Sequence, residues 1–292
     1  MHVGDRKEQQ DRVALFGHPK RPGMMMAVLA DGMGGHSGGA MAAEQVLIRA
    51  RQNFEAYAPL HETPEDLLRS VIDEAHTVIK LTRFTSEQDP HSTAVVFLLQ
   101  QGRAYWAHCG DSRLYMVRDG ELLTRTRDHS YLELRNAPPP GLDRINRNVL
   151  FTCLGSPTKP IYDITGPVYL EQGDRILLCS DGLWGTLSDE DIAKQLGRNT
   201  VSHAVPELVE DALRKAGDSS DNVTVIALEW ETPDAFESTQ GVSTDSISDD
   251  VFASTIQAGP LDGLVDDLDD AAIERSIAEI NEAIRRSAAR KA

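Results

Sequence analysis

The sequence predicts an α+β fold in which antiparallel sheets form the centre and helices lie outside them. Two observations indicate this class. Short apolar segments between residues 93 and 117 are separated or followed by the tight-turn pairs Gln101-Gly102 and Asp119-Gly120, which is typical of antiparallel hairpins. Helix-forming segments come before and after this group of strands and do not alternate with them, as a parallel doubly wound sheet would require.

Two helices are expected before the hairpins. Residues Ser37–Tyr57 are rich in alanine and other helix formers. A second helix begins at Thr63-Pro64-Glu65-Asp66, with a threonine N-cap, proline at the first helical position and acids near the positive end of the dipole. Its apolar residues recur with helical spacing on one face: Leu67, Leu68, Val71, Ile72, Ala75, Val78 and Ile79.

After this helix the pattern changes to strands, expected at Thr93–Gln100, Ala104–Cys109 and Leu114–Val117. The polar segment Leu170–Arg175 connects two later strands. A capping-box pattern at Ser188 opens a short helix. A last helix is expected from Pro206 to Lys215.

Three aspartates stand at the ends of apolar strands. Asp31 follows the run Met24–Ala30, and Asp181 follows a second such run. Asp221 precedes a third. An aspartate at the end of a buried strand cannot be solvated like a surface acid, so it requires a cation or a hydrogen-bond donor. Neighbouring glycines let backbone oxygens approach the same point. We therefore expect a shared, oxygen-rich metal site.

Five short motifs lie along roughly residues 1–231, in the segments Arg6–Asp11, Ala30–His36, Gly110–Arg113, Cys179–Trp184 and Asp221–Thr224. One Asp-Gly pair is a common turn, but five motifs in register are specific. In order and approximate spacing they resemble the motifs of the metal-dependent type 2C (PPM) Ser/Thr protein phosphatases, in particular the bacterial members.

This resemblance implies a four-layer α/β/β/α sandwich of two antiparallel sheets flanked by helix pairs, with metal ions at one edge. It implies two Mn²⁺ or Mg²⁺ ions and a third, weaker site. Hard ions of this kind prefer oxygen ligands, and the sequence has no Cys/His cluster for zinc. The implied ligands, in which glycine contributes its carbonyl and the first aspartate acts largely through waters, are Asp11, Asp31, Gly32, Asp111, Asp181 and Asp221.

The implied activity is hydrolysis of phosphoserine and phosphothreonine in proteins, by a hydroxide shared between two metal ions that attacks phosphorus directly. Arg6 would bind the phosphate through bidentate guanidinium geometry. His36 is the candidate general acid; its alternatives are to cap the following helix or to hydrogen-bond the metal shell. Arg113 is expected to be a buried ion-pair partner, and His129 to have a structural role.

The composition disfavours a membrane protein, a nucleic-acid-binding protein and a secreted, disulfide-bonded protein. Of the 292 residues 40% are hydrophobic, enough for a sizeable core, and no apolar run approaches the roughly 18 residues of a membrane span. The net charge of −17 disfavours nucleic acid as a partner. The first residues lack the pattern of a secretion signal. Three widely spaced cysteines, Cys109, Cys153 and Cys179, indicate free thiols rather than a disulfide. A cytoplasmic protein without a membrane partner is expected.

The last sixty or so residues differ from the rest. Residues 232–259 are rich in Ser, Thr, Asp and Gly without Lys or Arg, which predicts an acidic disordered linker. Residues 260–292 carry an apolar stripe with acids first and bases last, which predicts an amphipathic helix. This helix is expected to dock on a partner or back on the chain itself.

Two other functions remain open at this level. The first is a pseudophosphatase that binds phosphoproteins without hydrolysing them; it should have lost a metal aspartate, and this chain retains all of those expected. The second is an interaction module regulated by the C-terminal helix. For the phosphatase, the expected partners are phosphorylated proteins, namely a Ser/Thr kinase and its substrates.

Overall fold

The computed structural model describes residues 1–34, 37–82, 89–130, 133 and 150–231. The predicted linker at 232–259 and the predicted helix at 260–292 lie outside these residues. Within the described residues, no helix combines the length and the apolar character that a membrane span requires.

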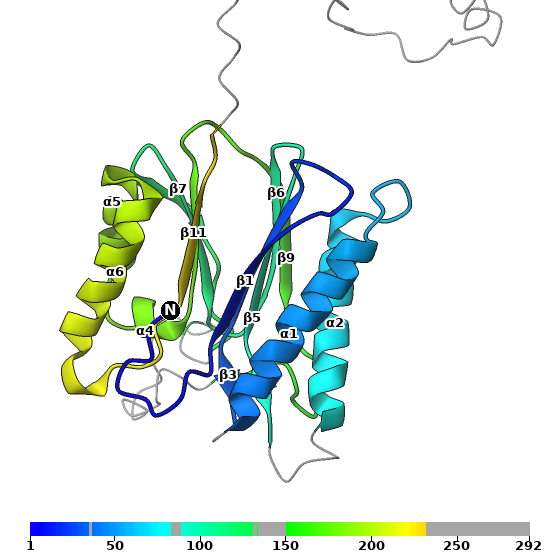
Figure 1. Cartoon of the computed structure of the whole chain (residues 1–292), viewed down its shortest axis with the longest axis horizontal. Coiled ribbons are helices and arrows are strands. Elements are labelled where there is room, and N and C mark those ends of the chain that lie inside the picture. The colour runs from blue at the N-terminus through cyan, green and yellow to red at the C-terminus, as the bar shows by residue number, and fades with distance from the viewer. Residues whose placement is uncertain (35–36, 83–88, 131–132, 134–149, 232–292) are drawn as a thin grey trace, which may run out of the picture. The chain divides into compact units, whose positions relative to one another are not determined.

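Two antiparallel sheets form the centre of the described residues (Figure 1). The first has five strands, in the order β1 (Arg12–Gly17), β2 (Met25–Ala30), β5 (Ala94–Gln100), β6 (Arg103–Cys109) and β9 (Asp163–Tyr169). The second has four, in the order β11 (Val225–Glu229), β10 (Arg175–Cys179), β7 (Arg113–Arg118) and β8 (Glu121–Arg125). A short ladder pairs β3 (Gly32–Met33) with β4 (His91–Ser92). The predicted α+β class with antiparallel sheets is confirmed.

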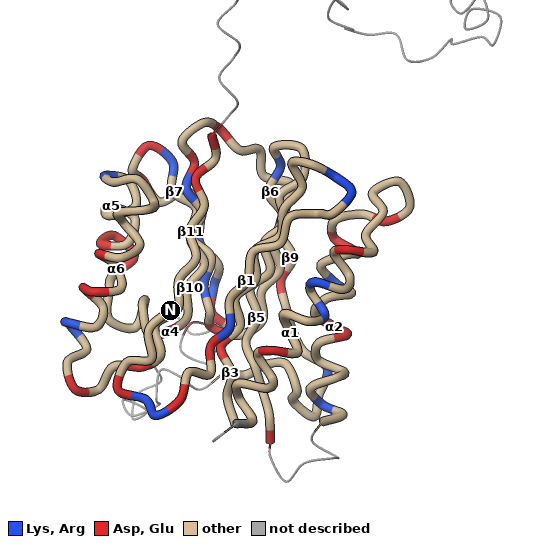
Figure 2. Tube along the Cα trace, viewed as in Figure 1, with Lys and Arg blue, Asp and Glu red and all other residues tan. Residues whose placement is uncertain are grey.

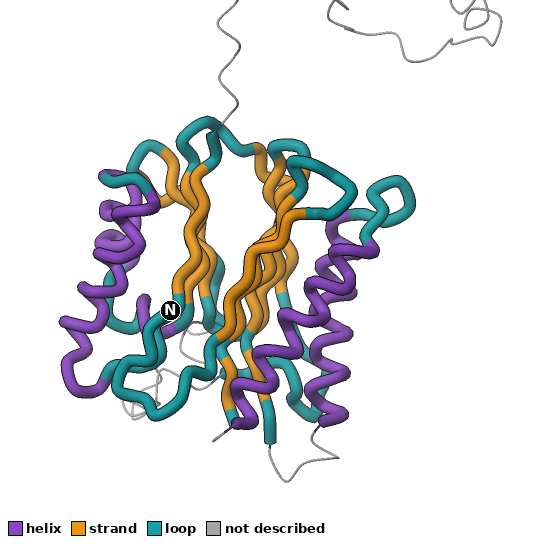
Figure 3. The backbone as a smooth tube through the Cα atoms, viewed as in Figure 1, coloured by secondary structure: helices purple, strands orange, loops and turns teal. Residues whose placement is uncertain are grey.

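Helices lie on the outer sides of the strands (Figure 3). The five-stranded sheet carries α1 (Ser37–Ala56) and α2 (Pro64–Thr82). The four-stranded sheet carries α4 (Asp181–Trp184), α5 (Asp189–Arg198) and α6 (Val201–Ala216), after which a single 3₁₀ turn covers Gly217–Ser219. The predicted N-caps are confirmed, because Thr63 Oγ1 accepts from the Asp66 N–H and Ser188 Oγ accepts from the Asp191 N–H.

The hairpin turns were placed correctly by the sequence. Gln101-Gly102 joins β5 to β6, and Asp119-Gly120 joins β7 to β8. All four residues have φ between +52° and +80°, the left-handed region that two-residue hairpins require. The segment Leu170–Arg175 also joins two strands, but β9 and β10 belong to different sheets, so this connection passes from one sheet to the other.

The predicted start of the last helix was wrong. α6 begins at Val201, and Pro206 lies inside it. Proline usually marks a helix start because it lacks an N–H and clashes with the preceding turn. Here Ala204, Leu208 and Ala212 are fully buried at a spacing of four residues, so packing of this face favours helix on both sides of the proline.

Three apolar clusters hold the elements together, and individual strands contribute to two of them. Met26, Val28 and Ala30 of β2 belong to the cluster shared with α1 and α2. Ala27 and Leu29 belong to the cluster shared by the two sheets. Because successive side chains of a strand point to opposite faces, both faces of β2 are buried. The third cluster joins β7, β10 and β11 to α4, α5 and α6.

Replacing Leu178 by alanine should lower the free energy of unfolding by about 2–5 kcal/mol. Leu178 is fully buried in the cluster between the sheets, so truncation leaves a cavity that neither sheet can fill. Leu123→Ala on the edge strand β8 is the matched control, since Leu123 is 48% exposed, and should change stability by no more than about 0.5 kcal/mol. Urea denaturation measures both; equal losses would contradict this assignment of the core.

Candidate active site

The register of β1 and β2 brings two predicted metal ligands together. These strands pair antiparallel with Arg12 opposite Ala30. Asp11 immediately precedes the first of these residues and Asp31 immediately follows the second. Because antiparallel neighbours run in opposite directions, the start of one strand lies beside the end of the next. The two aspartates therefore lie at the same end of the five-stranded sheet.

The second sheet brings three more carboxylates to its own end. Cys179 of β10 lies opposite Arg113 of β7 and opposite Val225 of β11. Three aspartates lie just outside these paired positions in the sequence: Asp111, Asp181 and Asp221. All three act electrostatically on Asp31, and Asp111 and Asp221 also act on Asp181, so the four aspartates form one cluster.

A cavity of about 670 Å³ opens at this cluster. Its lining includes most of the residues that the sequence predicted: Arg6, Asp31, Gly32, Asp111, Asp181 and Asp221. Asp11 is not part of the lining. It is 1% exposed and accepts a hydrogen bond of 2.8 Å from Ser180 Oγ. The candidate general acid His36 lies outside the described residues.

Burial, together with the charges of neighbouring carboxylates, disfavours ionisation of four carboxyl groups, those of Asp11, Asp31, Asp111 and Asp181. Burial, followed by the charges of Asp11 and Asp181, raises the pKa of Asp31 well above its usual range. Burial together with the charges of Asp111 and Asp221 raises the pKa of Asp181 to about 8. Burial raises the pKa of Asp111 to about 7, and that of Asp11 to about 6 although Ser180 donates to it.

The donor set fits hard divalent cations. Carboxylates that repel one another in a buried site require positive charge, and oxygen-only ligands are those of Mg²⁺ and Mn²⁺. Among the described residues, no cysteine or histidine lines the cavity. Arg6 supplies one positive charge, with its Nη2 at 2.6 Å from Asp221 Oδ2. In the part of the chain that the structure describes, six carboxyl groups line the cavity but only two basic side chains, those of Arg6 and Lys7, so the residues present suit additional cations.

The helix α1 packs tightly against one of the predicted ligands. A Cβ atom added to Gly32 would lie 2.0 Å from the carbonyl oxygen of Gly39 in α1. No side chain fits in that distance, so the close approach of the two backbones requires glycine. It sets the Gly32 backbone against the start of the helix and in the lining of the cavity.

Thr93 fixes the backbone of Asp31, and sequence reasoning missed this role. Its N–H donates to the Asp31 carbonyl oxygen at 2.9 Å, and its Oγ1 accepts from the Asp31 N–H at 3.0 Å. The same Oγ1 lies 2.7 Å from Ser112 Oγ, beside Asp111. Thr93 is fully buried and thus links the two chain segments that carry these aspartates. A hydroxyl at the head of an otherwise apolar strand was the available signal.

Ser180 connects the two sheets at the same end. Its Oγ donates to Asp11 Oδ2, and it also accepts from the Thr224 N–H at 3.1 Å. Asp11 belongs to the edge of the first sheet, whereas Ser180 and Thr224 belong to the second. The serine therefore holds the buried carboxylate in place from the opposite sheet.

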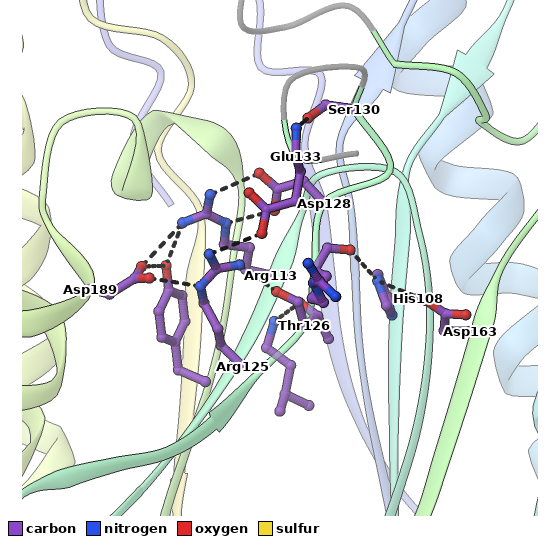
Figure 4. A network of polar contacts seen from close by, with 12 residues as sticks. His108, Arg113, Arg125, Thr126, Asp128, Ser130, Glu133, Asp163 and Asp189 are labelled. Carbon is purple, nitrogen blue, oxygen red and sulfur yellow. Dashed lines mark hydrogen bonds and ion pairs between the residues drawn. The ribbon is translucent and has the colours of Figure 1, made fainter. Parts of the chain in front are cut away.

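A buried ionic network supports the segment that follows β8 (Figure 4). Arg113 donates from Nε and Nη2 to both carboxylate oxygens of Asp128, at 2.7 and 2.8 Å, and its guanidinium lies 3.8 Å from the centre of the Trp184 ring. Asp189, at the start of α5, accepts from Arg113 and Arg125. The expectation that Arg113 is a buried ion-pair partner is confirmed.

Two stacked histidines lie beside this network, with ring centres 4.6 Å apart. His129 Nδ1 accepts from the Gly110 N–H at 3.2 Å, and its Nε2 contacts Asp163 Oδ2 at 3.2 Å. His108 Nε2 donates to the Arg127 carbonyl oxygen at 2.8 Å. Through its bond to Gly110, His129 supports the residue that precedes Asp111. The expected structural role of His129 is consistent with these contacts.

The two antiparallel sheets carry a cluster of aspartates at their common end, and comparison with known sequences identifies the family to which such a chain belongs. The sequence model described as protein phosphatase 2C matches residues 1–216. The chain belongs to this family, as a member of its bacterial type, so the resemblance drawn from the five motifs is confirmed.

Individual curated proteins with similar sequences are also serine/threonine phosphatases. The chain is 31% identical over 235 residues to the serine/threonine protein phosphatase PstP of Mycobacterium tuberculosis, an alignment that covers 78% of this chain and 44% of PstP. It therefore spans less than half of that relative. It is 29% identical to the serine/threonine phosphatase stp of Listeria monocytogenes, with 77% of this chain and 91% of stp covered.

Solved structures give the same result. The serine/threonine phosphatase of S. agalactiae superposes with a TM-score of 0.68 at 28% identity, covering 79% of this chain and 96% of that one. The catalytic domain of PstP in complex with two manganese ions superposes with a TM-score of 0.65 at 27% identity, covering 80% and 96%.

The metal-free protein should lose stability as the pH rises from about 5 to about 8. Asp11, Asp111 and Asp181 have folded-state pKa values of about 6, 7 and 8, above the unfolded value near 3.8, so the folded state holds extra protons in this range and loses them as the pH rises. Mn²⁺ replaces those protons, so its addition should raise the Tm more at pH 8 than at pH 5.

Differential scanning fluorimetry of EDTA-treated protein, with and without Mn²⁺, measures this effect. Asp181→Asn should reduce the pH dependence and the response to Mn²⁺. Asp119→Asn, which removes an exposed charge in a hairpin turn, is the control and should leave both unchanged. A Tm that does not respond to Mn²⁺ at either pH would contradict a metal site in this cavity.

Proposed function

We propose that this chain is a protein-serine/threonine phosphatase that hydrolyses phosphoserine and phosphothreonine with the help of two Mn²⁺ or Mg²⁺ ions. The observation that carries the proposal is the set of buried, mutually repelling carboxyl groups that lines a cavity beside Arg6. Family membership and the two manganese ions in the PstP structure support it.

In this proposal Asp31, the Gly32 carbonyl, Asp181 and Asp221 hold the two ions. Asp111 belongs to a third, weaker site. Ions of this kind, when bound, would lower the pKa of a bound water toward neutrality and would neutralise charge on phosphoryl oxygens. Asp11, which Ser180 holds by a hydrogen bond, supports the metal site largely through waters.

Arg6 is the proposed phosphate-binding residue. Its side chain is 62% exposed at the mouth of the cavity, so its guanidinium can reach a phosphoryl group presented from solvent. Pairing with Asp221 raises its pKa, so it is always positively charged. Two parallel N–H donors match the geometry of phosphate oxygens. His36 stays the proposed general acid.

The remaining features of the proposal concern organisation and partners. Residues 1–231 form the catalytic domain, as a four-layer α/β/β/α sandwich, a layer order that the three apolar clusters support. Residues 232–259 are a linker and residues 260–292 a docking helix. The partners are phosphorylated proteins, including a Ser/Thr kinase, in the cytoplasm. A pseudophosphatase is not favoured, because every expected metal aspartate is present.

Asp181→Asn should lower kcat for a phosphothreonine peptide by about 100-fold or more in the presence of Mn²⁺, because it removes a carboxylate that holds the ions. The wild-type protein should be inactive in EDTA and recover when Mn²⁺ is added. Phosphate release measured at several Mn²⁺ concentrations gives these values.

Asp119→Asn is the matched control for this experiment and should retain wild-type turnover. Hydrolysis that persists in EDTA and in Asp181→Asn would overturn the proposed mechanism. A folded, Mn²⁺-loaded wild-type protein that binds the peptide without turnover would favour the pseudophosphatase.

Truncation after Glu231 should leave turnover and Mn²⁺ affinity within about twofold of the full chain. Every described residue that lines the cavity lies before this point, and the last strand, β11, ends at Glu229. Kinetics and calorimetry on both proteins measure the effect. A gain in turnover on truncation would instead identify the tail as an inhibitor.

A further inference from the structure

We propose that Asn222 is a positioning residue that holds the Arg6-bearing loop at the rim of the cavity. This inference deepens the proposed function, in which Arg6 binds the phosphate. Asn222 directly follows Asp221 and is 5% exposed. It belongs to the lining of the same cavity. Its side chain interacts with a segment more than two hundred residues earlier in the chain.

The carboxamide of Asn222 makes hydrogen bonds to both ends of the loop that carries Arg6. Its Nδ2 donates to the carbonyl oxygens of Val3 at 2.8 Å and Glu8 at 3.1 Å. Its Oδ1 accepts from the Gln10 N–H at 2.8 Å. The first two partners lie on either side of Arg6, so a single amide ties both ends of the turn that carries the guanidinium.

The chemistry of these three contacts requires an amide. Two donors and one acceptor must be presented from one short side chain, and carboxylates lack the donors whereas hydroxyls have only one. Glutamine has the same groups but is longer by one methylene. In a buried position, each contact that is lost leaves a backbone group without its partner, and the loop is expected to shift to satisfy it.

The rest of the loop packs against the same segment. The Asp5 N–H donates to the Ser220 carbonyl oxygen at 3.0 Å, and the Asp5 carboxylate accepts from Ser220 N and Oγ. A Cβ on Gly4, which has φ +62°, would lie 2.2 Å from the Asp221 carbonyl oxygen. Figure 1 shows this N-terminal segment, in dark blue, crossing toward β1 at the end of the sheets where β3 is labelled, and Figure 2 shows basic positions flanked by acidic ones along it.

The side chain and the backbone of Asn222 have separate roles. The backbone N–H of Asn222 donates to Asp221 Oδ1 at 2.8 Å and so orients the predicted metal ligand. Substituting the side chain leaves this bond in place. Loss of the carboxamide should therefore impair substrate binding through Arg6 while Mn²⁺ affinity is retained, which a general loss of structure would not do.

A double-mutant cycle tests the proposal on the full chain with Asn222→Ala, Arg6→Ala and the double variant. The measured quantities are KM and kcat for a phosphothreonine peptide at saturating Mn²⁺, and Mn²⁺ affinity by calorimetry. Each single variant should raise KM about tenfold or more, since small misplacements of a binding group are costly. The double variant should be no worse than Arg6→Ala, because Asn222 acts through Arg6.

Two further variants keep the result interpretable. Asn222→Ser retains one donor and should give an intermediate KM if Asn222→Ala folds poorly. Ser188→Ala removes the N-cap hydrogen bond of α5, far along the chain, and controls for a comparable loss of stability; its KM should equal that of the wild type.

Effects of Asn222→Ala and Arg6→Ala on KM that multiply in the double variant would overturn the proposal. So would a loss of Mn²⁺ affinity in Asn222→Ala, or an unchanged KM in a folded variant. If the wild-type protein shows no turnover, the proposed function fails separately. In that case the Kd of the phosphothreonine peptide for the Mn²⁺-loaded variants, measured by calorimetry, replaces KM in the same double-mutant cycle.

Discussion

The burial of mutually repelling carboxyl groups at the common end of two sheets is the constraint on which the rest of this structure depends. Strand register forces Asp11 beside Asp31 and brings Asp111, Asp181 and Asp221 to the neighbouring sheet end. The raised pKa values of Asp31, Asp111 and Asp181 reflect how unfavourable their ionisation is without additional positive charge. Because a bound divalent cation would neutralise these buried negative charges, the arrangement favours cation binding, and this is the physical basis of the site.

The carboxylates are held by hydrogen bonds to their backbones and side chains, and the buried polar groups nearby have hydrogen-bond or ion-pair partners. Thr93 holds the backbone of Asp31 from two sides, and Ser180 holds Asp11 across the two sheets. Arg113 forms an ion pair with Asp128, and its guanidinium packs on the ring of Trp184. The ion pair supports the segment after β8, and breaking it would leave a buried charge without a partner. Ligands oriented in this way require little reorganisation when a cation binds.

The phosphate side of the cavity is built differently. Arg6 lies on a short loop rather than on a strand, and its side chain is largely exposed. The loop is nevertheless ordered by contacts with residues 220–223, the same segment that supplies Asp221. One segment thus serves the metal side through a carboxylate and the substrate side through the neighbouring amide. This proximity couples the position of the proposed phosphate-binding residue to that of a proposed metal ligand.

Local patterns in the sequence determined the two hairpin turns, the caps of α2 and α5, the buried strands and the aspartates at their ends. Each of these is set by interactions within a few residues, or by the need of a buried charge for a partner. Tertiary structure decided what depends on distant segments. These features are the continuation of α6 through Pro206, the connection from β9 to β10 between the sheets, and the hydrogen bonds of Thr93 to the Asp31 backbone. The roles of Ser180 and Asn222 belong to the same group, because their partners lie 169 and up to 219 residues away. No local periodicity encodes a hydrogen bond over that separation, so it emerges only when strand register and sheet packing bring the segments together.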